Sequence, residues 1–116
     1  MTDVPRLKTE LWVQAFLRAC ETRGQYGAVV HKGAAEAGAL HVAVNHLDGS
    51  YDLLSPAPGP AFDDKGERRF SNGFGRRVSW PEIAERMQRA RRIDSDLWLV
   101  EVEDRNGLAG LQQLDD

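Results

Sequence analysis

The side chains most suited to chemistry in this chain are concentrated in one arginine-rich segment. Nine of the fifteen lysines and arginines of the chain lie between Lys65 and Arg92, with three aromatic side chains interspersed among them. Arginine binds phosphate and carboxylate groups, and exposed aromatic rings stack on nucleic-acid bases. The residues predicted to contact a partner are Arg68, Arg69, Phe70, Phe74, Arg76, Arg77, Arg86 and Arg89.

The charge balance reverses after Arg92. From Asp94 onward the chain carries seven acidic residues and a single basic one, Arg105. Opposite blocks of charge are found on solvated faces, in pairs across a fold and at contact surfaces for a partner. The net charge of −3 argues against a surface wholly devoted to nucleic acid, although a local basic patch is compatible with it.

The three histidines, His31, His41 and His46, do not predict a metal site. His41 and His46 are five positions apart, so on one strand they point to opposite faces. His31 and His41 could meet across neighbouring strands, but two ligands do not complete a zinc site. We therefore expect no metal and no cofactor.

Nucleophilic and hydrolytic chemistry has little support in the sequence. Cys20 lies on the apolar stripe of a predicted helix, where it packs as a small hydrophobic residue. Ser50 and Ser55 lie near His46 in sequence, but no nucleophile elbow accompanies them. The order of elements is similar to that of the restriction-endonuclease-like core, yet the third strand, residues 51–54, lacks the lysine of that fold's acid-x-lysine step.

Two segments show the apolar spacing of amphipathic helices. In residues 7–23 this stripe comprises Leu7, Leu11, Trp12, Ala15, Phe16, Ala19 and Cys20. Residues 80–92 follow a capping box, in which Ser79 is the N-cap and Glu82 occupies position N3. The expected buried side of this second helix comprises Trp80, Ile83, Ala84, Met87 and Ala90.

The pair Asp48-Gly49 is a strong hairpin signal and predicts a two-residue type I′ turn, with Val44 opposite Leu53. Residues 25–32 form a predicted strand that joins this hairpin in a three-stranded antiparallel meander. Residues 70–74 form a short edge strand. The last strand, residues 97–103, is apolar on both faces, and this favours a central position beside the first strand.

These elements predict an α+β fold in the order α-β-β-β-α-β. Both helices are expected to cover the same face of a mainly antiparallel sheet of four or five strands. One domain, residues 1–116, contains a core over about 6–107, an irregular Pro/Gly/Arg-rich segment at 55–79 and a weakly held tail at 108–116. The expected buried residues are Leu11, Trp12, Phe16, Val29, Val42, Val44, Leu53, Ile83, Met87, Trp98 and Val100.

Composition places the chain among ordinary globular proteins, with 41% hydrophobic and 28% charged residues. A single cysteine excludes an internal disulfide and favours a reducing compartment. The first eight residues lack the apolar region of a secretory signal, and no apolar run reaches the roughly 18 residues of a membrane span. We expect a cytoplasmic protein that does not contact a membrane.

Four stretches of the chain together resemble a known family. They are residues 7–13, 44–49, 56–58 and 94–104, of which the last, with Asp96-Leu97-Trp98, is the most specific. In this order they are similar to small bacterial proteins catalogued as domain of unknown function 1491. The resemblance spans about residues 6–107, is poor over 61–78, and implies a small single-domain bacterial protein without an assigned activity.

The expected function is that of a non-enzymatic binding or adaptor module that contacts a protein partner. One alternative is a nucleic-acid-binding module that uses residues 65–92. The other is a metal-dependent hydrolase or nuclease-like domain. A contiguous positive face with exposed aromatic rings would favour the first alternative, and a cluster of buried acids with a nearby lysine or histidine in a pocket would favour the second.

Overall fold

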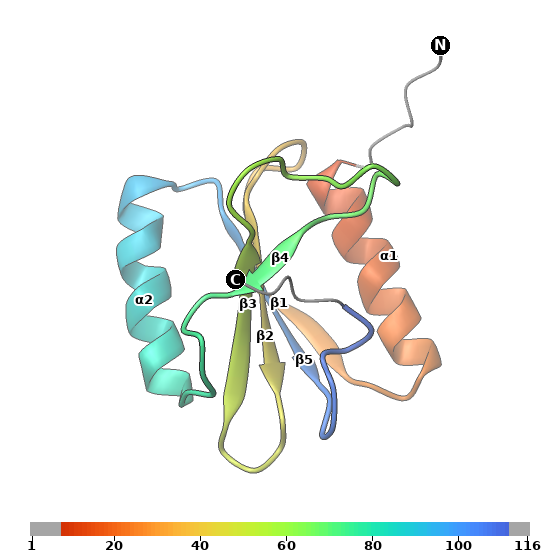
Figure 1. The fold of residues 1–116 in the computed structure, drawn as a ribbon, viewed down its shortest axis with the longest axis vertical. Helices are drawn as coiled ribbons and strands as arrows, with labels where there is room; N and C mark the ends of the chain where they lie inside the picture. The colour runs from red at the N-terminus through yellow and green to blue at the C-terminus, as the bar shows by residue number, and fades with distance from the viewer. Residues whose placement is uncertain (1–7, 112–116) are drawn as a thin grey trace.

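The computed structural model describes residues 8–111, which form two helices and five strands. In chain order these are α1 (Thr9–Thr22), β1 (Gly27–His31), β2 (Leu40–Asn45), β3 (Tyr51–Pro56), β4 (Phe70–Asn72), α2 (Trp80–Ile93) and β5 (Trp98–Glu103). The strands make one sheet, with α1 on one side of it and α2 on the other (Figure 1). Leu7 of the predicted first helix and residues 112–116 of the predicted tail lie outside the described residues.

The sheet is mixed, with the strand order β1-β5-β2-β3-β4. Strand β5 pairs antiparallel with β1 and parallel with β2, while the other pairs are antiparallel. The prediction that the last strand lies centrally and beside the first is confirmed. The predicted meander is wrong, because β5 separates β1 from β2. A strand with apolar side chains on both faces is stabilised most in an interior position, and β5 occupies one.

The connection between β1 and β2 crosses the beginning of β5 in close contact. The Ala34 N–H donates to the Asp96 carbonyl at 2.9 Å, and Trp98 Nε1 donates to the Ala34 carbonyl at 2.8 Å. A Cβ atom on Gly33 or Gly38 would lie 2.0 or 2.2 Å from the Asp96 carbonyl oxygen. Glycine is therefore required at both positions by close backbone approach.

The α1 side of the sheet holds the larger hydrophobic cluster, which includes Val42, Val44, Leu54, Trp98 and Val100. Helix α1 contributes the buried residues Thr9, Val13, Phe16 and Cys20. This stripe differs from the predicted one: the Leu11 side chain is 50% exposed, and Ala15 and Ala19 are also exposed. Thr9 can be buried because its hydroxyl donates to the Gly38 carbonyl at 3.0 Å.

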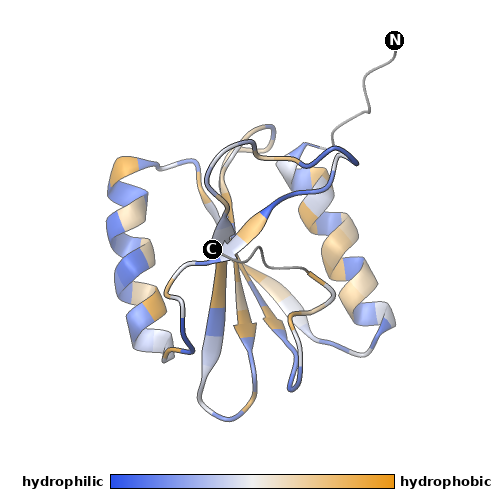
Figure 2. Cartoon of the chain, in the orientation of Figure 1, coloured by the Kyte–Doolittle hydropathy of each residue, from blue (hydrophilic) through white to orange (hydrophobic). Residues whose placement is uncertain are grey.

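The α2 side holds a second cluster, made of Ala43, Leu53, Val78, Ile83, Met87, Leu97 and Leu99. The prediction that both helices share one face is therefore wrong. Strands β2, β3 and β5 are apolar on both faces, so each face needs its own covering layer. Figure 2 shows these apolar strands between the two helices. Trp98 is buried beneath α1 alone, and Val29, another predicted core residue, is 41% exposed on β1.

The beginning of α2 confirms the predicted capping box. The Ser79 N–H donates to Glu82 Oε2 at 2.9 Å. This bond, assisted by the Arg76 guanidinium, lowers the pKa of Glu82 to about 2. The sequence motif thus places the first turn of the helix correctly.

The β2–β3 connection is wider than predicted. Asn45 pairs with Tyr51 and Val44 with Asp52, so residues 46–50 form the loop and the predicted Val44–Leu53 pair is wrong. Positive φ angles occur at Leu47 (64°) and Gly49 (91°). Side chains hold this shape: Asn45 Oδ1 accepts from the Leu47 N–H at 2.8 Å, and Asp48 Oδ1 from the Ser50 N–H at 2.9 Å.

Candidate functional site

The predicted arginine-rich surface is divided between the two sides of the sheet. Arg68 contacts Trp12 of α1, whereas Phe74 packs against the cluster beneath α2. Arg69 and Phe70 follow Arg68, and Arg76, Arg77, Arg86 and Arg89 accompany Phe74 on or near α2. The eight residues therefore do not form one contiguous face.

On the α2 side, the four predicted arginines are engaged within the protein. Arg76 pairs with Glu82 at 2.7 Å, and Arg89 pairs with Glu85 at 3.2 Å. These are exposed ion pairs of the kind that contribute little to stability. Both arginines therefore already have an acidic partner within the protein.

The Arg86 guanidinium covers the ring of Phe74, 3.5 Å from its centroid, and donates to the Gly73 carbonyl. Arg77 is about half exposed, with Nε 3.9 Å from Asp52 Oδ2. Both arginines thus help to hold the segment that leads from β4 into α2. The ring of Phe74 is occupied by a cation and is only partly accessible for stacking.

On the α1 side, the three predicted residues differ in their accessibility. Phe70 is 2% exposed and belongs to the core, so its ring is not available to a base. Arg69 Nη1 donates to the carbonyls of Pro58 and Pro60, at 2.9 and 2.6 Å, and closes the loop before β4. Arg68 lies against the α1 helix and has no acidic partner within 4 Å among residues 8–111.

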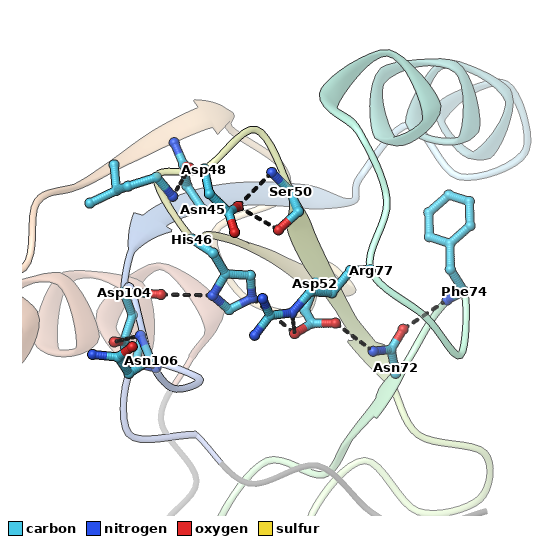
Figure 3. Close-up of polar contacts among 12 residues, drawn as sticks. Asn45, His46, Asp48, Ser50, Asp52, Asn72, Phe74, Arg77, Asp104 and Asn106 are labelled. Carbon is cyan, nitrogen blue, oxygen red and sulfur yellow. Dashed lines mark hydrogen bonds and ion pairs between the residues drawn. The ribbon is translucent and has the colours of Figure 1, made fainter.

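A polar network that the sequence did not predict joins the β2–β3 loop to the end of β5 (Figure 3). The His46 ring is 2% exposed and uses both nitrogens: Nδ1 lies 2.8 Å from the Asp104 carbonyl oxygen, and Nε2 lies 3.0 Å from Asp52 Oδ2. Asp52 Oδ1 accepts from Asn72 Nδ2 at 2.9 Å. Residues from three parts of the chain are therefore connected through one imidazole.

The proton requirement of this network follows from its acceptors. A carbonyl oxygen only accepts, so Nδ1 of His46 carries a proton. Nε2 faces a carboxylate, and a hydrogen bond there needs a further proton on Nε2 or on Asp52. The ring is buried and its hydrogen-bonding capacity is filled by the protein. We interpret this network as structural, because both ring nitrogens of a buried histidine are already used within the protein.

His41 and Ser55 form a second pair on the α2 side, with Nδ1 3.0 Å from Oγ. Burial lowers the pKa of His41 to about 4, and the Asp94 carboxylate opposes that shift. A nucleophilic serine would need a base that is oriented by a third group. Within the described range no acid hydrogen-bonds to His41, and no group of three or more His, Cys, Asp or Glu side chains could hold a metal ion.

A groove lies between β1 and α2, beside an exposed edge of the sheet. Its cavity of about 330 Å³ is lined by Val30, His31, Trp80, Ala84, Met87, Gln88, Arg91 and Leu99. A second hollow, of about 350 Å³, continues past His31 and Gln88 to Arg91, Arg92 and Ser95. We call the two together the β1–α2 groove. One part is apolar and the other is basic, and none of these lining residues is acidic.

Strand β1 forms one wall of this groove and is an edge of the sheet. Among residues 8–111, its only neighbouring strand is β5. Tyr26, Val29 and Val30 are 69%, 41% and 46% exposed, which leaves apolar side chains at an open strand edge. The consecutive residues Val29 and Val30 could have indicated this apolar edge from the sequence. The predicted meander instead placed a hairpin strand beside them, so the edge was not expected to be open.

The family model described as "Protein of unknown function (DUF1491)" matches residues 7–112. The crystal structure of a DUF1491 family protein from Caulobacter crescentus CB15 is 37% identical, with a TM-score of 0.74, and the match covers 92% of this chain and 96% of that one. The solution structure of a protein from A. tumefaciens is 40% identical, with a TM-score of 0.81, covering 97% and 98%. No curated protein matches the chain.

Membrane insertion of the described helices can also be judged from their length and composition. Neither α1 nor α2 is long and apolar enough to cross a bilayer.

Proposed function

This chain belongs to the DUF1491 family, whose description assigns no activity, and we propose that it is a non-enzymatic module that binds a protein partner through the β1–α2 groove. The observation that carries this proposal is the open edge of β1 beside an apolar groove. Unpaired strand edges bind extended segments by strand addition, in which backbone hydrogen bonds supply affinity and flanking pockets select side chains.

The occupant that fits this groove is an extended segment of a partner protein with acidic residues at one end. Val30 and Ala84, which are both exposed, offer apolar surface next to the open edge. Arg91 and Arg92, in the last turn of α2, provide the positive charge. Opposite charges across an interface increase the rate of association and fix the register of a bound segment.

The eight contact residues predicted from the sequence are less suited to bind a partner than the β1–α2 groove. Their arginines on the α2 side are paired or packed internally, and Phe70 is buried. The proposed partner is still a protein, as the sequence predicted. Its contact with the basic segment is now placed at the end of that segment, at Arg91 and Arg92.

The proposal is tested by selection from a phage-displayed library of random eight-residue peptides on the full chain. We expect enrichment of peptides with β-branched or aromatic residues followed by Asp or Glu, and reduced binding at high salt. Backbone NMR shifts caused by a selected peptide should centre on β1 and α2. The variant Arg91→Glu with Arg92→Glu should lose these peptides. Arg89→Glu, a single charge reversal on the same helix but outside the groove, should keep them.

Other outcomes would overturn the proposal. They are the absence of enriched peptides, the same peptides selected by the double variant, and shifts remote from β1. A concentration-dependent dimer joined through β1 would show that a second copy occupies the edge. Salt-sensitive binding of a single-stranded oligonucleotide that is lost in Arg76→Glu with Arg77→Glu would favour the nucleic-acid alternative.

A further inference from the structure

A pocket of about 490 Å³ lies at the beginning of α1, and none of its described lining residues belongs to the β1–α2 groove. The segment before β2, the end of β3 and the loop before β4 enclose it. The apolar part of its lining comprises Ala37, Ala39, Leu40, Pro56, Ala61, Phe62 and Phe70. Concave apolar pockets with a few polar groups are the usual sites for small molecules.

Arg68 is the unusual polar group of this pocket. Its guanidinium carbon lies 5.0 Å from the Phe62 ring centroid and 5.7 Å from that of Trp12. Nη2 donates to Thr9 Oγ1 at 3.0 Å, while Nε is shielded from solvent without a hydrogen-bond partner in the described part of the chain. Burial lowers the pKa of Arg68 from its usual value. The Arg68 guanidinium is therefore held in a fixed orientation, and no acidic side chain among residues 8–111 pairs with its positive charge.

The other charged residues of the pocket are largely compensated. Lys8 pairs with Glu36 at 3.0 Å, and Arg69 donates to backbone carbonyls. With Asp94 included, the part of the lining that residues 8–111 provide carries three basic and two acidic side chains, an excess of one positive charge. A partly buried cation without an acidic partner is destabilising, and one negative charge would compensate it.

We propose that this pocket binds a small organic carboxylate, with its single negative charge on the Arg68 guanidinium and its apolar body against Phe62 and Leu40. The planar guanidinium matches the geometry of a carboxylate, and charge-assisted bonds of this kind are about twice as strong as neutral ones. The excess of one charge favours a monoanion over a phosphate dianion. Thr9, which accepts from Nη2, positions the guanidinium.

The test compares 4-phenylbutyrate with its neutral amide on the full chain, by the shift in Tm and by NMR titration. The acid should raise Tm with increasing concentration, because it binds the folded state, and the amide should not. Arg68→Gln should weaken acid binding by at least about tenfold. Arg89→Gln, which removes an exposed arginine outside the pocket, should bind the acid as the wild type does.

A second variant covers the case in which Arg68→Gln does not fold. Ala61→Phe places a large side chain at an exposed position of the pocket wall and keeps the charge, so it should also weaken acid binding. Equal effects of acid and amide would overturn the proposal. So would retention of acid binding in Arg68→Gln or Ala61→Phe, and the absence of any acid-dependent shift. Binding of inorganic phosphate in preference to the acid would also contradict a monoanion site.

Discussion

His46 Nε2 lies 3.0 Å from Asp52 Oδ2, and the pair joins the loop after β2 to the second residue of β3. The histidine also reaches the Asp104 carbonyl, so one ring connects the β2–β3 loop to the end of β5. Asp52→Ala would leave Nε2 without a partner in a buried setting. We expect a loss of about 1–3 kcal/mol in the free energy of unfolding.

Urea denaturation of the two proteins measures that loss. Glu85→Ala, which breaks an exposed pair on α2, is the matched control and should change stability by less than about 0.5 kcal/mol. An Asp52→Ala midpoint equal to that of the control would mean that the His46–Asp52 contact contributes nothing.

The burial of His41 predicts a pH dependence of stability. Its pKa is about 4 in the folded chain, against 6.5 as the ordinary value. Between these values the unfolded chain binds a proton at this site that the folded chain does not. Stability should therefore fall as pH decreases from 6.5 to about 4, by up to about 3 kcal/mol from this group. In His41→Gln, urea midpoints should lose this part of the slope, and an unchanged slope would exclude His41 as its source.

Trp98 is 2% exposed and contacts the core beneath α1, with its indole N–H bonded to the Ala34 carbonyl. Trp98→Ala should cost roughly 3–5 kcal/mol, because it leaves a large cavity and an unpaired carbonyl. Thermal and urea unfolding measure the cost. A variant of near-normal stability would contradict the burial of this side chain.

The β2–β3 loop allows two opposite predictions. Leu47 has a φ of 64°, which costs an L side chain about 1–2 kcal/mol, so Leu47→Gly should stabilise the chain by up to about 1 kcal/mol. Gly49 has a φ of 91°, so Gly49→Val should cost on the order of 1–2 kcal/mol. Melting temperatures that move in the same direction for both variants would be inconsistent with this loop geometry.

The sequence was sufficient to identify both helices, the strands and the interior position of β5. Local rules determine these features: the Ser79–Glu82 capping box specifies a helix beginning, and a strand that is apolar on both faces favours an interior position in the sheet. The side of the sheet on which each helix lies is not determined locally. It depends on Ala43 and Leu53 together, whose apolar face needs a helix of its own.

The candidate sites were harder to predict, because they depend on what the fold brings together. Arg68 and Thr9 are 59 positions apart, yet they form one wall of a pocket. Val30 was predicted to lie on a strand. Its exposure could not be predicted, because it arises from the position of β5 between β1 and β2, which leaves β1 at the edge of the sheet. The loop register was missed because the side chains of Asn45 and Asp48 hydrogen-bond to the backbone and widen a turn that the Asp-Gly pair alone would make tight.

The interior position of β5 also affects how the chain is made. The ribosome synthesises β1 and β2 long before β5, and during that interval the two edges that β5 will join are both open. Nascent chains with open apolar edges are prone to aggregate, and pairing between distant segments such as Gly27 and Val102 is slow. The sheet can therefore be completed only after β5, its last strand, has been synthesised. Until then the open edges of β1 and β2 are exposed to aggregation.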